Sequence, residues 1–292
     1  MTALPDSLRW VAAIWAFTVG AVVGSFLNVV IARIPAGESI VRPGSRCPSC
    51  RTPIGWRDNV PVLSWLALRG RCRTCRTGIS WRYPLVELLG GGAALVSVWR
   101  HGLSLPALAE FAFAAALLGL AFIDLDTWLL PHVITLPLLG AGLLLSALHV
   151  TPAASILGSV AGAAAGWVGF ALVAFLGERI LKKEALGFGD VWLLAAIGAW
   201  LGIAPLLPVV LLASLQGTLV GLALILAGRS QPGPPPDSGP VDAGPVDVEP
   251  DWVPPRNAVP FGPFLALGAL EWLWLQAWIT RAVPGLSIFG SS

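Results

Sequence analysis

Two pairs of cysteines stand near each other in the first third of the chain, as Cys47-Pro-Ser-Cys50 and Cys72-Arg-Thr-Cys75. The pairs are separated by 21 residues, a spacing typical of a zinc site with four thiolate ligands. Two disulfide bonds are the alternative, but they are rare in the reducing cytoplasm, where the basic residues described below place this segment. Because four thiolates fill the coordination shell of tetrahedral zinc, we predict a structural rather than a catalytic metal site.

Carboxyl groups inside apolar stretches form the second set of residues that could do chemistry. A charged carboxylate near the bilayer centre costs at least about 2.5–3.5 kcal/mol on insertion scales, so its presence needs a reason. The acidic residues in such stretches are Glu87, Glu110, Asp124, Asp190 and Glu271. Asp124 ends one apolar stretch and Asp190 begins another 66 residues later, so a fold could bring the two together at one membrane edge.

Two aspartates held close together cannot both ionise, and they therefore share one proton. In an aspartic protease, one carboxylate of such a pair takes a proton from water while the other carboxyl group donates to the peptide. Aspartates at a membrane edge are also common as helix caps or loop residues, and Asp126 competes with Asp124 for the catalytic role. The residue types alone therefore leave the chemistry of the pair open.

The elements that must position these residues are helices in a membrane. Of the 292 residues, 56% are apolar and only 12% are charged, and the mean hydropathy is +0.78. A soluble protein has about 25% charged residues, so a soluble globular enzyme is excluded, and so is a disordered scaffold. Stretches of roughly the 20 apolar residues that a span needs are 8–34, 83–99, 105–123, 133–150, 153–176, two within 191–227, and 261–279.

These stretches predict an all-α polytopic membrane protein with about eight transmembrane helices and a small zinc-knuckle domain. The division of 191–227 rests on Gly202 and Pro205 near its middle, and a single span there would reverse the side of the C-terminus. Glycines at every fourth position, Gly158, Gly162 and Gly166, predict a close helix contact. The first stretch lacks a charged start and is expected to remain as a span rather than to be removed as a signal peptide.

The basic residues predict which side of the membrane each loop occupies. Ten of the 18 Lys and Arg residues lie between Arg33 and Arg82, and cytoplasmic loops carry such an excess. The cysteine pairs, Asp124 and Asp190 are therefore expected at the cytoplasmic face, with the N-terminus outside. This topology explains the basic cluster without a nucleic-acid partner, and the same charges would hold the loop against anionic membrane lipid.

Further motifs carry a resemblance to a known family. The chain is similar, from about residue 20 to 270, to the type IV prepilin peptidases, bacterial membrane aspartic proteases that are often also N-methyltransferases. The residues that carry the resemblance are 24–31 with Arg33 and Pro35, the two Cys-x-x-Cys pairs, 79–87, 129–131, Gly187-Phe188-Gly189-Asp190 and 260–264. In the family's pattern the first catalytic aspartate stands seven residues before the proline of the Leu-Pro turn, which selects Asp124 over Asp126 here.

The resemblance implies catalytic roles for Asp124 and Asp190, structural Zn²⁺ on the four cysteines and S-adenosylmethionine as a second cofactor. It implies an enzyme of the bacterial cytoplasmic (inner) membrane with its active site at the cytoplasmic face. Its substrates would be prepilin or pseudopilin precursors, each with a basic leader and a hydrophobic helix. The leader would be removed after a glycine and the new N-terminus methylated. The chain has no fingerprint that locates a methyl-donor site.

Two positions depart from the family's pattern. His132 follows Pro131 where the family usually has Asp, and Trp192 follows Asp190 by two positions where the family usually has Lys. The alternative is therefore a catalytically altered paralogue that acts as a non-enzymatic pilus or secretion assembly subunit. A proton-relaying transporter is a third reading, but both aspartates lie at one membrane edge rather than at the midplane.

Other polar residues are expected to be structural. Arg82 is predicted to pair with Glu87, although Glu87 could instead belong to a methyl-donor site. Glu110 and Glu271 are expected at the outer interface or in buried hydrogen bonds, and His101 and His149 are expected to be solvated.

The predicted domains follow from the spans and the resemblance. Residues 1–34 form the first transmembrane helix, 35–82 a cytoplasmic zinc-binding domain and 83–227 a transmembrane aspartic peptidase core. Residues 228–258, rich in Pro and Gly, form a flexible cytoplasmic linker, and 259–292 the last transmembrane helix and tail.

Overall fold

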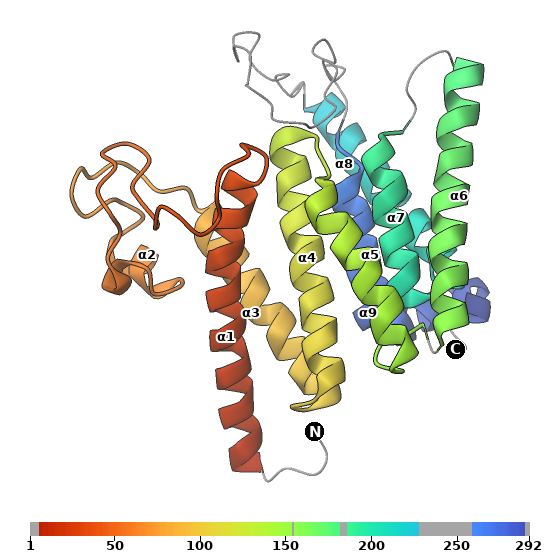
Figure 1. The fold of residues 1–292 in the computed structure, drawn as a ribbon, viewed down its shortest axis with the longest axis horizontal. Coiled ribbons are helices and arrows are strands. Elements are labelled where there is room, and N and C mark those ends of the chain that lie inside the picture. The colour runs from red at the N-terminus through yellow and green to blue at the C-terminus, as the bar shows by residue number, and fades with distance from the viewer. Residues whose placement is uncertain (1–5, 154, 182–185, 228–258, 290–292) are drawn as a thin grey trace.

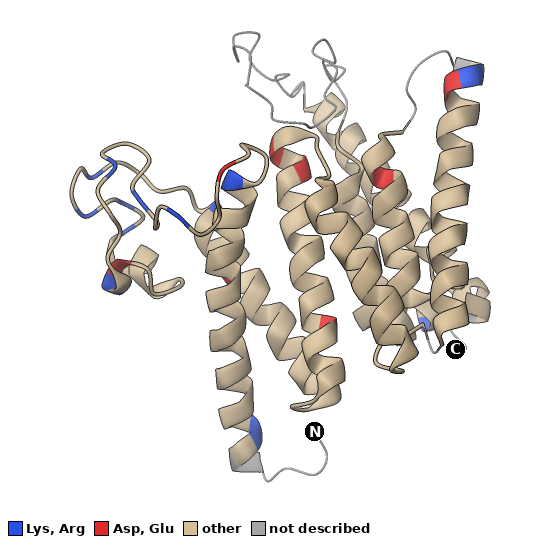
Figure 2. Ribbon diagram, viewed as in Figure 1, with Lys and Arg blue, Asp and Glu red and all other residues tan. Residues whose placement is uncertain are grey.

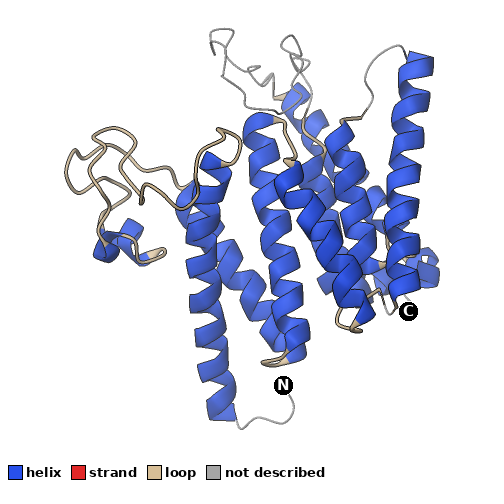
Figure 3. Ribbon diagram, viewed as in Figure 1, coloured by secondary structure: helices blue, strands red, loops and turns tan. Residues whose placement is uncertain are grey.

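The computed structural model describes residues 6–153, 155–181, 186–227 and 259–289. Eight long helices make up most of these ranges: α1 (Asp6–Arg33), α3 (Arg82–His101), α4 (Leu105–Thr127), α5 (His132–Ala147), α6 (Ile156–Leu181), α7 (Phe188–Leu201), α8 (Leu206–Leu226) and α9 (Gly262–Ala282). Short helices are η1 (Trp56–Asp58), α2 (Leu63–Ala67) and η2 (Pro284–Phe289). No strand occurs in the described ranges (Figure 3), which confirms the predicted all-α class.

The helices satisfy the requirement that lipid imposes on a backbone, because each helix pairs its own N–H and C=O groups internally. Four are long and apolar enough to cross a bilayer: Leu8–Arg33, Leu105–Thr127, Ile156–Ile180 and Leu206–Leu226. Two more, His132–Ala147 and Phe188–Leu201, are apolar but shorter. The predicted linker at 228–258 lies outside the described residues.

The helices run up and down in a bundle, and residues 34–81 project from one end of it, beside the C-terminus of α1 (Figure 1). We call this the loop end. The C-terminus of α4 and the N-termini of α5 and α7 also reach the loop end (Figure 1). Charged residues are concentrated there and in the projecting segment, whereas the middle of the bundle contains few of them (Figure 2).

Helix α7 forms the centre of the bundle. Every residue from Leu193 to Leu201 is buried, and α7 packs against α5, α6 and α9. Trp200 stacks on Phe113 of α4 with ring centroids 4.8 Å apart, and its Nε1 donates to the Leu138 carbonyl at 2.7 Å. An indole buried with its N–H paired in this way adds apolar contact without an unsatisfied donor.

The break between α7 and α8 occurs where the sequence predicts it. Gly202 adopts a left-handed φ of 86° and Pro205 caps the N-terminus of α8, so 191–227 forms two helices. The predicted glycine contact is also present, because a Cβ on Gly166 of α6 would lie 2.6 Å from the Leu194 carbonyl oxygen of α7. These small residues let the backbones of α6 and α7 approach closely.

Candidate functional site

Asp124 lies in the last turn of α4 and is only 5% exposed. Helix α4 ends at its C-cap residue Trp128, which donates its N–H to the Asp124 carbonyl at 2.9 Å and then turns the chain away through a left-handed conformation. The Asp124 carboxyl group accepts the backbone N–H of Gly262, at the start of α9. A Cβ on Gly262 would collide with this carboxyl oxygen, so the close approach requires glycine. The N-terminus of α9 thus supplies a donor and a favourable dipole to a buried acid.

Asp190 is the third residue of α7 and is 7% exposed. Its carboxyl group accepts the N–H of the N-cap residue Gly187, and its own N–H donates to the Gly187 carbonyl at 3.0 Å. An acidic residue at this position commonly reaches back to the N-cap amide. Its Oδ1 is buried and has no hydrogen-bond partner among the described residues. A buried oxygen left unpaired costs stability, so it indicates a group kept for water or substrate.

Leu130, in the turn between α4 and α5, connects the surroundings of the two aspartates. Cβ atoms placed on Gly189 and Gly262 would lie 2.8 Å from Leu130 Cβ and 3.2 Å from Leu130 Cδ1, respectively. The starts of α7 and α9 therefore pack against the same side chain. Asp124 is also close enough to Asp190 to act on it electrostatically. The fold thus brings together two acids that stand far apart in the sequence.

Asp126, the competing candidate, has different surroundings. Its side chain is 39% exposed and forms an ion pair with Arg82 at the start of α3. The predicted pairing of Arg82 with Glu87 is therefore wrong. Glu87 is buried and instead accepts the backbone N–H of Val62 at 2.7 Å, which fastens the projecting segment to α3. Arg82 reaches the C-terminus of α4, where a cation is favoured by the helix dipole.

His132 and Trp192, the two residues that depart from the family's pattern, lie next to each other in the fold. The ring of Trp192 lies edge-on to that of His132, with centroids 6.0 Å apart. Trp167 of α6 and Phe188 of α7 approach Trp192 in the same manner, at 6.2 and 6.4 Å. No sequence signal relates His132 to Trp192, or Trp167 to either of them. Edge-to-face contacts of this kind stabilise an aromatic cluster, and two of its members, Phe188 and Trp192, each stand two residues from Asp190 in α7.

The four cysteines converge in the projecting segment. Their sulfur atoms all lie within 4.8 Å of one another, with Cys47 Sγ 3.7 Å from Cys75 Sγ and Cys50 Sγ 4.0 Å from Cys72 Sγ. These separations are too long for disulfides, whose S–S bond is about 2.05 Å. In a tetrahedral site with metal–sulfur bonds of about 2.3 Å, the sulfur atoms lie roughly 3.8 Å from one another. The observed sulfur–sulfur separations are close to that value. The cluster could therefore hold one tetrahedral metal ion.

Each cysteine pair forms a turn of the same design. Arg51 donates its N–H to the Cys47 carbonyl at 2.9 Å, and Arg76 donates to the Cys72 carbonyl at 3.1 Å. Both arginines have a positive φ, of 56° and 62°. The Thr77 hydroxyl and backbone amide lower the pKa of the Cys75 thiol to about 6, so the metal-binding thiolate form is favoured at neutral pH.

A further polar cluster lies at the opposite end of α4. Glu110 is buried and accepts from Arg100 Nη1 at 2.6 Å and from Trp274 Nε1 at 3.0 Å. His101 Nε2 lies 2.8 Å from the same carboxylate, a contact that the sequence did not predict, although His101 is exposed as expected. Glu110 was expected in a buried hydrogen-bonding role, which is confirmed. The cluster joins α3, α4 and α9 and contains no unpaired carboxyl oxygen among the described residues.

These features define a class: polytopic helical proteins with a buried aspartate pair and a four-cysteine cluster at the same end of the bundle. The chain belongs to the Type IV leader peptidase family, which matches residues 111–222 and so includes both aspartates. Residues 18–101, which include all four cysteines, match the Bacterial Peptidase A24 N-terminal domain.

Curated relatives match over nearly the whole chain. A prepilin leader peptidase/N-methyltransferase of Myxococcus xanthus is 39% identical over 97% of this chain and 96% of the relative. Proteins of the same name from Burkholderia pseudomallei and Klebsiella pneumoniae are 38% and 43% identical, over 93% and 68% of this chain and 87% and 89% of the relatives. No solved structure matches the chain.

Proposed function

We propose that this protein is a membrane aspartic endopeptidase that removes the leader from type IV prepilins or pseudopilins and N-methylates the new N-terminus. The observation that carries the proposal is the buried pair of Asp124 and Asp190, each held by a backbone amide at a helix N-terminus, with Asp190 Oδ1 left unpaired. The names of the relatives support the same function. Nothing in the structure or the comparisons supports the alternative of a non-enzymatic assembly subunit.

In the proposed reaction the pair holds one proton between two carboxyl groups. The charged carboxylate accepts a proton from water as the water oxygen attacks the carbonyl carbon of the scissile peptide. The protonated carboxyl group donates to the carbonyl oxygen, and a proton then passes to the amide nitrogen as the C–N bond breaks. Gly187 has no side chain, and the atom nearest to its missing Cβ is Asp190 Oδ2, so an extended substrate backbone could approach Asp190 closely on that side.

The substrate class follows from the place of the pair at the end of an apolar bundle. A precursor with a hydrophobic helix would lie in the bilayer beside the peptidase, and its basic leader would stay in the aqueous phase. The leader junction would then reach the depth of Asp124 and Asp190. We propose that the bundle spans the bacterial inner membrane and that its loop end faces the cytoplasm, because basic residues are concentrated at that end (Figure 2).

The proposed cofactors are zinc and S-adenosylmethionine. Cys47, Cys50, Cys72 and Cys75, whose sulfurs all lie within 4.8 Å of one another, would hold one Zn²⁺ with a structural role, since four thiolates fill a tetrahedral coordination shell. We propose that residues 35–82 form a zinc-binding domain and 83–227 the peptidase core. S-adenosylmethionine would supply the methyl group, a proposal supported by the N-methyltransferase name of the relatives.

Co-expression with a prepilin tests both activities together. In a host that lacks its own prepilin peptidase, the precursor should lose its leader only when this protein is present. Mass spectrometry of the mature N-terminus should show one added methyl group. An intact precursor would contradict the peptidase proposal, whereas a cleaved but unmethylated N-terminus would contradict the methyltransferase proposal alone.

A further inference from the structure

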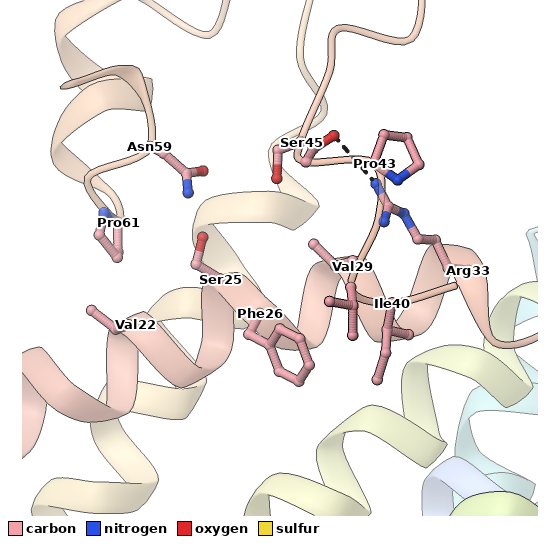
Figure 4. Close-up of a pocket in the computed structure, with 12 residues that line it drawn as sticks. Val22, Ser25, Phe26, Val29, Arg33, Ile40, Pro43, Ser45, Asn59 and Pro61 are labelled. Carbon is pink, nitrogen blue, oxygen red and sulfur yellow. Dashed lines mark hydrogen bonds between the residues drawn. The ribbon is translucent and has the colours of Figure 1, made fainter. Parts of the chain in front are cut away.

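A cavity of about 320 Å³ lies between α1 and the projecting segment (Figure 4), and neither aspartate lines it. We call it the α1 pocket. Its helix wall consists of Val22, Ser25, Phe26, Val29 and Arg33. The opposite wall comes from residues 40, 41, 43–45, 59 and 61. The proposed peptidase reaction uses none of these residues.

The polar side of the α1 pocket carries donors and one positive charge. Arg33 donates to the Ser39 carbonyl at 2.8 Å and to the Gly44 carbonyl at 3.5 Å, which uses two of the five N–H groups of a guanidinium. Ser25, Ser45 and Asn59 add hydroxyl and amide groups (Figure 4). No acidic residue lines the pocket. The chemistry therefore favours an anion.

Two acidic residues stand close to the pocket wall in the sequence, and neither cancels this charge. Asp58 precedes Asn59 and accepts from Arg73 Nε at 2.8 Å and from Arg73 Nη2 at 2.6 Å. This ion pair holds the pKa of Asp58 below its ordinary value. Asp58 is thus engaged outside the pocket wall. Glu38, five residues after Arg33, is exposed and does not line the pocket, so Arg33 carries the one formal charge among the lining residues.

The apolar side continues along α1 toward the N-terminus of that helix. Phe26 and Val22, which line the pocket, are 47% and 54% exposed. Val19, Trp15 and Val11 follow at intervals of three or four residues and are also exposed, at 38%, 57% and 62%. Residues at this spacing share one face of a helix. An exposed apolar stripe thus leads from the pocket along a helix long enough to cross the bilayer.

We propose that the α1 pocket binds an anionic phospholipid, with its phosphate beside Arg33, its glycerol and ester oxygens near Ser25, Ser45 and Asn59, and its acyl chains along the α1 stripe. Charge complementarity selects the anion, and the continuity of the pocket with the stripe selects an amphiphile over a soluble phosphate. Bound there, the lipid holds the projecting segment against the membrane surface. The proposal is independent of the peptidase reaction.

Lipid binding by the full-length protein tests this proposal. The protein is purified in detergent, mixed with phosphatidylglycerol or phosphatidylcholine and examined by native mass spectrometry. The wild type should retain one phosphatidylglycerol in preference to phosphatidylcholine. Arg33→Gln and Asn59→Asp should each weaken that binding about tenfold, the change expected when one hydrogen bond to a charged group is lost.

The control is Arg57→Gln, because Arg57 contacts the Trp56 ring at 5.3 Å and does not line the pocket. All three substitutions change the net charge by one unit. Asn59→Asp preserves side-chain shape and the Arg33 contacts, so it separates lipid binding from folding of the loop. Equal weakening in all three variants would overturn the proposal, as would equal retention of both lipids. Displacement of the lipid by glycerol 3-phosphate or by S-adenosylmethionine would overturn it too.

Discussion

At the scale of single residues, the aspartates obtain their hydrogen bonds from backbone amides rather than from cationic side chains. Asp124 accepts from Gly262 and Asp190 from Gly187, and each amide lies at the start of a helix. Amide donors fix the position of a carboxyl group without adding a formal charge beside it. Two acids held in this way can still exchange a proton with water or substrate.

The arrangement predicts that Gly262→Ala lowers peptidase activity although alanine is an ordinary helix residue. A methyl group at this position collides with the Asp124 carboxyl group and with Leu130. We expect kcat/KM for a prepilin peptide to fall at least about tenfold, since a displaced catalytic group costs more than 1.4 kcal/mol in the transition state. The matched control is Gly92→Ala in α3, where a Cβ meets nothing within 4 Å. Equal activity of the two variants would contradict the proposed position of Asp124.

The sequence could identify the residues of the pair but not their surroundings. Counting back from Pro131 selects Asp124 over Asp126, and the structure gives a physical reason, because Asp126 is exposed and paired with Arg82. The contact between His132 and Trp192 could not be predicted, since it depends on how α5 meets α7. Glu87 was misassigned for a similar reason. Its partner is the backbone N–H of Val62. Because every residue except proline has such a donor, the sequence does not show which one a carboxylate will accept.

At the scale of elements, Glu87 connects the projecting segment to the bundle. Glu87→Ala leaves the Val62 N–H without its partner, at a cost of about 1–3 kcal/mol for a buried donor. We expect faster trypsin cleavage at the arginines of residues 34–81, measured on the purified protein. Glu87→Gln keeps an acceptor oxygen and should cleave at nearly the wild-type rate. Identical digestion of all three proteins would show that this contact does not restrain the segment.

The contact between α6 and α7 gives a second prediction at this scale. Gly166→Val places side-chain atoms against the Leu194 carbonyl and forces the helices apart, which should lower the thermal unfolding midpoint by several degrees. Gly169→Val lies on the same helix where a Cβ meets nothing within 4 Å, so it controls for the helix propensity of valine. Unfolding midpoints that fall equally would contradict the close contact.

Helix existence could be predicted well because hydropathy reports directly on burial in lipid or protein. The glycine at 202 and the proline at 205 also located the break between α7 and α8. Helix length could not be predicted as well. Helix α7 has 14 residues and is about 21 Å long, because it lies in the protein interior and starts at the depth of Asp190. Hydropathy does not distinguish burial against protein from burial against lipid.

At the scale of the whole molecule, the protein divides its tasks between a bundle and a projecting segment. The bundle holds the aspartates through helix packing, whereas residues 34–81 contain only short helices and have one buried hydrophobic residue, Cys47. A segment of this size with so little core usually needs a metal for stability. The two parts should therefore respond differently to loss of zinc.

We expect one zinc per chain by elemental analysis, and none in a Cys47→Ser/Cys72→Ser variant. Loss of zinc should expose the projecting segment to protease while the helix content measured by circular dichroism changes little. The thiolate ligands must stay deprotonated, so acid should release zinc as well. Zinc retention in the double variant would contradict the four-cysteine site. A collapse of the whole bundle would contradict the division into two parts.

The most direct test of the central claim is leader cleavage by purified Asp124→Asn, Asp190→Asn and Asp126→Asn variants in lipid. Asparagine keeps the size of aspartate but cannot take the proton from water. We predict that the first two variants lose prepilin cleavage by at least about a thousandfold, while Asp126→Asn stays within a fewfold of the wild type. Wild-type helix content and an unchanged thermal unfolding midpoint would show that the bundle of each variant is folded. Cleavage that survives substitution of Asp124 or Asp190 would contradict the aspartate-pair mechanism.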